Sequence, residues 1–148
     1  MPGVQPTPPA SNPEGRRIIT FGTFDLFHVG HVNVLRRARG LGDWLTVGIS
    51  SDELNARKKG RRPYFSIDER LVIVGDHRCV DEVFVEESLE QKADYLRQYR
   101  ADVLVMGDDW QGRFDHYRSI CEVVYLSRTP EISSTAIISV VRGDVHVA

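Results

Sequence analysis

Two histidines lie three residues apart in the stretch GTFDLFHVGH, Gly22–His31. The stretch follows Arg17–Phe21, which has the character of a buried strand, and leads into a segment with helical periodicity. The N-terminus of a helix carries free backbone N–H groups and the positive end of the helix dipole, so it attracts anions. His28 and His31 would face one side of this helix start and donate hydrogen bonds to a phosphate. The stretch therefore predicts a phosphate-binding loop.

Other interpretations of the two histidines stay open from their spacing alone. A zinc site would need a third ligand, for which Asp25 is the nearby candidate. The glycine spacing differs from that of the dinucleotide-binding and P-loop motifs, which disfavours those sites. Histidines in loops also often have a purely structural role. Gly22 and Gly30, however, would let the backbone approach a ligand closely, which favours binding.

The overall composition is that of an ordinary globular domain. The chain has 148 residues, of which 41% are hydrophobic and 27% charged, and its formal net charge is −2. This balance argues against a general nucleic-acid binder. Basic residues are dense in one place, the run ARKKGRR from Ala56 to Arg62.

The two cysteines and the absence of long apolar runs restrict the class of protein further. Cys79 and Cys121 have neither the spacing of a metal site nor the number needed for a disulfide framework, which fits a reducing compartment. No apolar run approaches the roughly 20 residues that span a bilayer, and the N-terminus lacks the apolar core of a signal peptide. We therefore expect a cytoplasmic protein with no membrane partner.

Strand-like runs alternate with helix-like segments along most of the chain. The predicted strands are Arg17–Phe21, Trp44–Ser50, Glu82–Val85, Val103–Met106 and Val123–Leu126. The predicted helices are Val29–Arg39, Ile67–Val74, Leu89–Tyr99 and Ser134–Arg142. This alternation predicts an α/β fold of the Rossmann-like, doubly wound kind, a five-stranded parallel sheet with helices on both faces. Ligands bind such sheets at the carboxyl ends of the strands, near a switch point.

The chain divides into one domain and two tails. Residues 1–15 contain five of the seven prolines and little that could be buried, so we expect a disordered tail. The folded domain is predicted to cover residues 16–142, and residues 143–148 form a short C-terminal tail.

The motifs resemble those of a known family. GTFDLFHVGH resembles the first motif of the nucleotidyltransferase superfamily that carries histidine–x–glycine–histidine. RTPEISST, Arg128 to Thr135, resembles the second motif of the cytidylyltransferase branch, although Pro130 and Glu131 stand where that branch usually has Glu-Gly. VDE at 80–82, VMGDDWQGRFD at 105–115 and CEVVYLSRT at 121–129 are most similar to the glycerol-3-phosphate cytidylyltransferases.

The resemblance implies transfer of CMP from CTP to a phosphomonoester, most simply glycerol 3-phosphate, with release of pyrophosphate. A phosphomonoester is already largely ionised near neutral pH, so no general base is required, and positioning and charge stabilisation remain. The alternatives are ATP as donor with an acceptor such as FMN, or CTP with phosphocholine, phosphoethanolamine or ribitol 5-phosphate. A nucleotide sensor without turnover is a further alternative.

The resemblance also assigns roles to residues of this chain. The implied catalytic residues are His28, His31, Lys58, Arg61 and Arg128. The implied nucleotide-binding residues are Gly22, Thr23, Phe24, Asp25, Gly30, Asp109, Arg128, Thr129, Ile132, Ser133 and Ser134. Arg70 and Arg78 are implied to bind the acceptor phosphate. Lys58 and Arg61 would belong to a mobile basic loop that closes over the triphosphate.

Two further expectations concern cofactors and partners. Mg²⁺ should accompany the triphosphate, held mainly by phosphate oxygens and waters, so no dedicated protein metal site is expected. The partners are CTP and a small phosphomonoester, and a homodimer is expected because the family commonly forms one.

Overall fold

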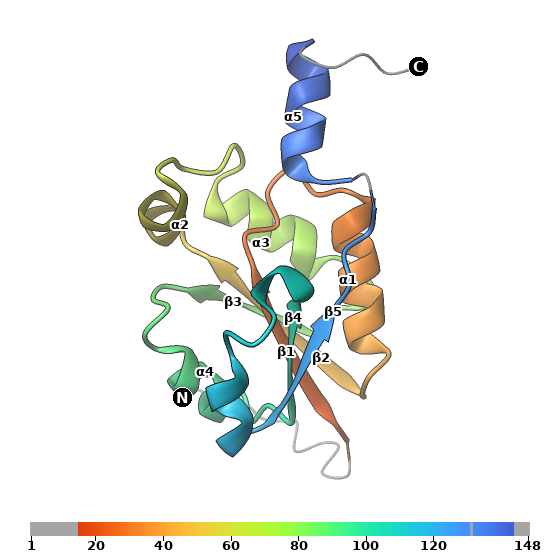
Figure 1. The fold of residues 1–148 in the computed structure, drawn as a ribbon, viewed down its shortest axis with the longest axis vertical. Helices are drawn as coiled ribbons and strands as arrows, with labels where there is room; N and C mark the ends of the chain where they lie inside the picture. The colour runs from red at the N-terminus through yellow and green to blue at the C-terminus, as the bar shows by residue number, and fades with distance from the viewer. Residues whose placement is uncertain (1–14, 131, 144–148) are drawn as a thin grey trace.

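A five-stranded parallel sheet forms the centre of the molecule (Figure 1). The computed structural model describes residues 15–130 and 132–143. The strands are β1 (Arg17–Gly22), β2 (Trp44–Ser50), β3 (Glu82–Glu86), β4 (Val103–Gly107) and β5 (Glu122–Leu126). Each predicted strand is present, and four of the five extend by one residue beyond the predicted bounds.

Helices cover both faces of the sheet, which confirms the predicted doubly wound class. The helices are α1 (Val29–Arg39), α2 (Asp52–Lys59), α3 (Ile67–Gly75), α4 (Lys92–Gln98) and α5 (Ser134–Arg142), with 3₁₀ segments η2 (Asp108–Trp110) and η3 (Asp115–Ser119). α1 and α3 pack on one face, and α4, η2 and η3 pack on the other. The helices of the described residues are all too short or too polar to cross a membrane.

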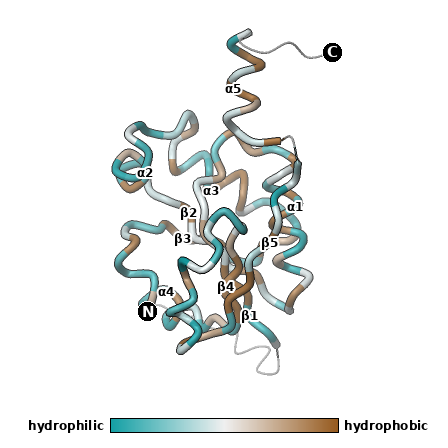
Figure 2. The backbone as a smooth tube through the Cα atoms, in the orientation of Figure 1, coloured by the Kyte–Doolittle hydropathy of each residue, from teal (hydrophilic) through white to brown (hydrophobic). Residues whose placement is uncertain are grey.

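The apolar pattern of the strands explains the two cores. Ile18 and Val103 point to the α1 side, while the neighbouring Ile19 and Leu104 point to the α4 side. Strands buried on both faces have continuous apolar runs instead of alternation, which is what β1 and β4 show. Figure 2 shows this concentration of hydrophobic residues in the central strands.

The strand order β3-β2-β1-β4-β5 creates a switch point between β1 and β4. The chain builds outward from β1 to β3, then crosses to the other side of β1 to form β4 and β5. The connections after β1 and β4 therefore leave the sheet in opposite directions, and a crevice opens between them at the carboxyl ends. The two sequence motifs lie at this edge, because they follow β1 and β5.

Two helical segments differ from the prediction by more than one residue at an end. The basic run 56–62 was predicted to be a loop, but its first half belongs to α2, which Ser51 caps by accepting the N–H of Leu54. The predicted helix from Leu89 begins only at Lys92. The Ser88 hydroxyl accepts the N–H of Glu90 at 3.1 Å, a local turn that competes with a helix. Residues 1–14 of the predicted N-terminal tail and 144–148 of the C-terminal tail lie outside the described residues.

A buried ion pair joins the end of β3 to the start of α4. Nζ of Lys92 lies 2.9 Å from Oε2 of Glu86, and the two side chains are 3% and 2% exposed. The same ammonium group lies 3.5 Å from the centre of the Phe21 ring. Burial lowers the pKa of Lys92, while the Glu86 carboxylate opposes that shift. Each charge is tolerated at this depth because the other is present.

We expect Lys92→Met to lower the free energy of unfolding by about 3–5 kcal/mol, because it leaves the Glu86 carboxylate buried without its partner. The double variant Lys92→Met/Glu86→Gln should recover much of that loss. Urea unfolding measures both values. Arg118→Met, which breaks the exposed pair with Asp115, is the control and should change stability by less than about 1 kcal/mol. A loss of less than about 1 kcal/mol for Lys92→Met would contradict the conclusion that the buried Glu86 carboxylate depends on Lys92.

Candidate active site

A cavity of about 360 Å³ opens at the carboxyl ends of β1 and β4. This volume lies within the range of roughly 300–1,000 Å³ that is typical of small-molecule sites. Within the described residues, its lining comes from the first motif, the end of α2 and the loop after it, the start of η2, and the second motif. The crevice predicted from the topology is therefore present.

The cavity brings together most of the predicted site residues. Those that line it are His28, His31, Arg61, Arg128, Gly22, Thr23, Phe24, Asp25, Gly30, Asp109, Thr129, Ile132, Ser133 and Ser134. Three predicted residues, Lys58, Arg70 and Arg78, lie outside this lining.

The two histidines cap the N-terminus of α1. Nδ1 of His28 accepts the N–H of Gly30 at 3.0 Å, and Nδ1 of His31 accepts the N–H of His28 at 3.1 Å. This is a capping box in which imidazoles replace the usual hydroxyl and carboxylate. The rings stack with their centroids 3.9 Å apart. The backbone thus fixes the orientation of both rings.

The caps also determine which ring nitrogen carries the proton. Because both Nδ1 atoms are acceptors, the neutral rings carry their protons on Nε2, which are left as donors. Burial lowers the pKa of His28. Burial, reinforced by repulsion from His28, lowers the pKa of His31 to about 4. Both rings are therefore neutral N–H donors near neutral pH.

Gly30 is required by the close approach of the His28 ring. A Cβ atom at position 30 would lie 2.7 Å from a carbon of that imidazole and 3.4 Å from Ile132. Any other residue would push the ring out of its capping position. The histidine–x–glycine–histidine spacing thus has a steric reason in this fold.

The second motif is joined to the first by hydrogen bonds. Ser133 caps α5 by accepting the N–H of Ala136 at 3.0 Å. The hydroxyl of Ser134 donates to the carbonyl oxygen of Asp25 at 2.8 Å. Nδ2 of Asn33, on α1, donates to the hydroxyl of Thr129 at 3.0 Å. Two helix N-termini, those of α1 and α5, therefore lie at one cavity and both favour an anion there.

Asp25 holds the chain that follows α2. Its carboxylate accepts the backbone N–H groups of Tyr64, at 2.7 Å, and Phe65, at 2.9 Å. Asp25 was predicted to bind the nucleotide, and it does line the cavity, but its carboxylate oxygens are engaged by the protein backbone. In this structure Asp25 fixes the shape of the site.

Arg70 is buried with no exposed surface, away from the cavity lining. Its guanidinium donates to the carbonyl oxygens of Thr23, at 2.9 Å, Ser50, at 2.7 Å, and Phe65, at 3.0 Å. It also bonds Asp52 at 2.8 Å. The prediction that Arg70 binds the acceptor phosphate is at odds with this geometry, because its donors are engaged by the protein. Arg70 joins the ends of β1 and β2 to α2 and α3.

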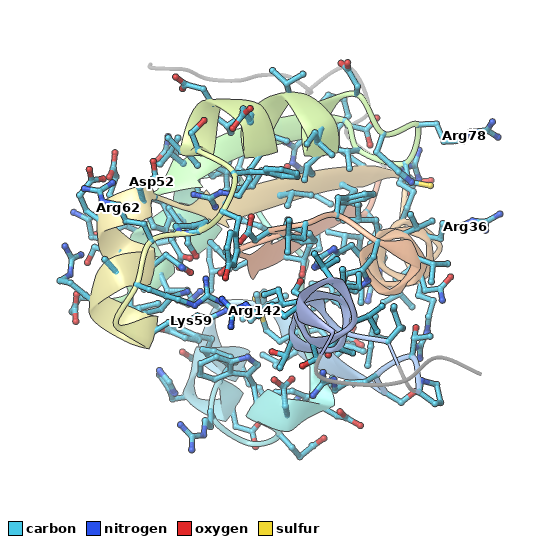
Figure 3. The ribbon with its side chains drawn as sticks, turned by 90° about the horizontal axis from the view of Figure 1, so that it is seen from above. Arg36, Asp52, Lys59, Arg62, Arg78 and Arg142 are labelled. Carbon is cyan, nitrogen blue, oxygen red and sulfur yellow. The ribbon has the colours of Figure 1, made fainter. Side chains whose placement is uncertain are left out.

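Arg78 also lies away from the cavity, in the exposed turn between α3 and β3. This turn is at the amino end of β3, opposite the carboxyl edge where the cavity opens. Figure 3 shows Arg78 pointing outward on the same side as Arg36. Within this chain, the geometry does not bring Arg78 to the site that the prediction gave it.

Of the two cations predicted in the basic segment, Arg61 lines the cavity and Lys58 does not. Nζ of Lys58 donates to the hydroxyl of Ser50 at 2.9 Å, at the end of β2, and burial lowers its pKa. Lys59 takes the place at the cavity that was predicted for Lys58. Sequence reasoning missed Lys59, and also Asn55, whose Oδ1 accepts the Thr23 hydroxyl at 2.8 Å. Adjacent residues on a helix point about 100° apart, so a helical assignment would have separated Lys58 from Lys59.

The donor set fits a magnesium ion that arrives with a nucleotide. Within residues 15–130 and 132–143, no group of three or more His, Cys, Asp or Glu side chains is placed to hold a metal. Asp109 is exposed and lines the cavity, so one carboxylate is available to a metal–phosphate complex. Phosphate oxygens and water would supply the remaining ligands, as Mg²⁺ prefers.

We expect acid to destabilise the fold through His31. The unfolded chain takes up this proton near pH 6.5, whereas the folded chain takes it up only near pH 4. Between these values the unfolded state binds more protons, so the free energy of unfolding falls as the pH drops. The His31→Gln variant keeps an acceptor for the His28 N–H but does not titrate.

Urea unfolding at intervals between pH 4 and 6.5 measures this effect. Wild type should lose on the order of 2 kcal/mol more than His31→Gln across this window. His116→Gln, at an exposed histidine of η3, is the matched control and should follow wild type. Parallel curves for wild type and His31→Gln would show that His31 is not the group responsible.

Known proteins share this chain's sequence over most of its length. A sequence profile of the family described as cytidylyltransferase-like matches residues 19–140. Glycerol-3-phosphate cytidylyltransferase of Bacillus subtilis (strain 168) is 48% identical over 128 residues, which cover 86% of this chain and 98% of that protein. The protein of the same name from Staphylococcus aureus (strain NCTC 8325 / PS 47) is 45% identical over 122 residues, covering 82% and 92%.

A solved structure supports the fold. The lipopolysaccharide core biosynthesis protein from Thermoplasma volcanium GSS1 superposes with a TM-score of 0.69 at 24% identity, covering 78% of this chain and 98% of that one. The sequence profile spans both motifs and the sheet between them, so the resemblance seen in the motifs is confirmed. The chain belongs to the cytidylyltransferase-like family.

Proposed function

We propose that this chain transfers CMP from CTP to glycerol 3-phosphate, giving CDP-glycerol and pyrophosphate. The observation that carries the reaction type is the pair of neutral imidazoles whose Nδ1 atoms are both engaged by the α1 backbone and whose Nε2 protons remain as donors at a cavity. The acceptor is proposed because the two relatives described above, which match this chain over nearly their whole length, are named for it.

The transfer is a single displacement at phosphorus. A phosphate oxygen of the acceptor forms a bond to the α-phosphorus of CTP. The bond from that phosphorus to the oxygen bridging to the β-phosphorus breaks, and pyrophosphate leaves with the bridging oxygen. The acceptor oxygen is already ionised near neutral pH, so the protein has no proton to remove.

The chain's own residues stabilise the charge that develops. His28 and His31 donate from Nε2 at the N-terminus of α1, where the helix dipole adds to their effect. Lys59 and Arg61 line the side of the cavity formed by the end of α2 and the loop after it. This arrangement suits a reacting phosphorus at the histidines and a pyrophosphate group at the cations.

Mg²⁺ is part of the proposal, with Asp109 as the carboxylate that would meet it. When bound to the triphosphate, the ion would offset phosphate charge and favour departure of pyrophosphate. Phosphate oxygens and water would provide its other ligands.

The proposed substrates are tested by pyrophosphate release in the presence of Mg²⁺. CTP or ATP is paired with glycerol 3-phosphate, ribitol 5-phosphate, phosphocholine, phosphoethanolamine or FMN. We expect release with CTP and glycerol 3-phosphate. Release only with another nucleotide and acceptor would identify that pair as the substrates. Nucleotide binding without pyrophosphate release would favour a nucleotide sensor.

The role of the histidines is tested by variants that keep the caps. In His28→Asn, the amide oxygen still accepts the Gly30 N–H, but the Nε2 donor is lost. We expect turnover to fall about 100- to 1,000-fold, the usual effect of removing one transition-state donor, with little change in melting temperature. His116→Asn, on exposed η3, is the control and should keep wild-type turnover. Near-normal turnover of His28→Asn would contradict the assigned role.

Two further expectations stay predictions. The homodimer implied by the family would need an apolar contact surface, and Val29 and Val72 are exposed on α1 and α3. The cytoplasmic location predicted from the composition is compatible with the use of CTP.

A further inference from the structure

Tyr64 contacts two residues that line the cavity, Asp25 and Arg61, and the last residue of α5. Its backbone N–H donates to the Asp25 carboxylate at 2.7 Å. The guanidinium carbon of Arg61 lies 5.1 Å from the centre of its ring, a cation–π contact. Its hydroxyl accepts a hydrogen bond from Nη2 of Arg142 at 2.8 Å. Tyr64 thus holds two guanidinium groups, from elements far apart in the sequence, against one phenol.

Arg142 reaches Tyr64 from the far end of α5. Ser134 and Arg142 are the first and last residues of this helix, about two turns apart along its axis. Ser134 bonds the Asp25 carbonyl at the base of the helix, and Arg142 bonds Tyr64 about two turns later. α5 therefore contacts residues around the site at both of its ends, although the helix stands out from the sheet (Figure 1).

Among the residues that the structure describes, the partner of Arg142 is the neutral phenol of Tyr64, which orients the guanidinium without compensating its charge. Arg62 differs, because the carboxylates of Asp52 and Glu53 lie 3.9 Å and 3.5 Å from its guanidinium. Figure 3 labels Arg142 and Arg36 on different sides of the molecule, with Arg36 pointing outward. Arg142 shares the Tyr64 phenol with Arg61, which lines the cavity.

We propose that Arg142, held by the Tyr64 hydroxyl, acts with Arg61 as a clamp on the pyrophosphate end of the nucleotide. The inference rests on the proposed function, which places the reacting phosphorus at the histidines and the leaving group toward the basic segment. A pyrophosphate group carries several negative charges. One planar guanidinium group can bind two phosphate oxygens through two parallel N–H bonds. The C-terminal helix therefore contributes its N-terminus and a cation from its last turn to the same site.

The test measures binding of pyrophosphate directly, by calorimetry on the full chain with Mg²⁺ present. Arg142→Gln should raise the Kd for pyrophosphate about three- to tenfold, as expected for one lost charge-assisted contact. Tyr64→Phe keeps the ring under Arg61, removes the hydroxyl, and should have a smaller effect in the same direction. The double variant should be no weaker than Arg142→Gln, because the hydroxyl acts through Arg142. Arg36→Gln is the matched control and should bind as wild type does.

Steady-state kinetics separates a clamp from a structural role. The KM for CTP should rise with the Kd for pyrophosphate in Arg142→Gln, while the KM for glycerol 3-phosphate stays unchanged. Equal pyrophosphate affinity in wild type and Arg142→Gln would overturn the proposal. An equal rise in the Kd for pyrophosphate and in both KM values, together with a lower melting temperature, would also overturn it. If pyrophosphate binds and Arg142→Gln weakens it, but CTP and glycerol 3-phosphate give no turnover, the clamp stands and the proposed function fails.

Discussion

The buried guanidinium of Arg70 is the constraint on which the arrangement of the site depends. A charge without exposed surface is tolerated only when hydrogen bonds replace its water, so its acceptors must stay in place. Those acceptors are the carbonyls of Thr23, Ser50 and Phe65 and the carboxylate of Asp52. The ends of β1 and β2, the start of α2 and the approach to α3 are thereby fixed to one another. The Asp25 carboxylate accepts the backbone N–H of Phe65, and Arg70 donates to the carbonyl oxygen of the same residue. Both backbone groups of Phe65 are therefore held in place.

The N-terminus of α1 shows how one pair of residues serves both structure and chemistry. Serine, aspartate and asparagine are the usual caps, and an aspartate there would repel a phosphate. An imidazole accepts the capping N–H on Nδ1 without adding negative charge, and it presents an N–H from Nε2. Burial keeps His28 and His31 neutral near neutral pH. The helix cap therefore sets the tautomer that the proposed reaction needs.

The sequence carried enough information for the sheet and for the positions of the phosphate-binding motifs. Apolar runs mark the strands, and the bounds of α1 and α5 follow from clear helical spacing ahead of Gly40 and Gly143. α2 was missed because it has little apolar periodicity, although its Ser51 cap, acidic first turn and Gly60 were readable signals. Arg70 was misassigned for a different reason: a basic residue on a helix has the same pattern whether its guanidinium faces a phosphate or the carbonyl ends of two strands. Only the packing of α3 against those strand ends decides between these roles.

The two ends of the bound triphosphate would meet different kinds of protein surface, and this difference suits turnover. The reacting phosphorus would lie at α1, where neutral donors are held by the backbone. Such donors gain most as charge develops, which favours the transition state over the bound substrate. Pyrophosphate would meet Lys59, Arg61 and Arg142, long side chains on more exposed elements. Exposed charges of this kind attract an anion more weakly and are screened by salt. The product is then held less firmly than the transition state, so the arrangement that favours the chemical step does not retain the leaving group.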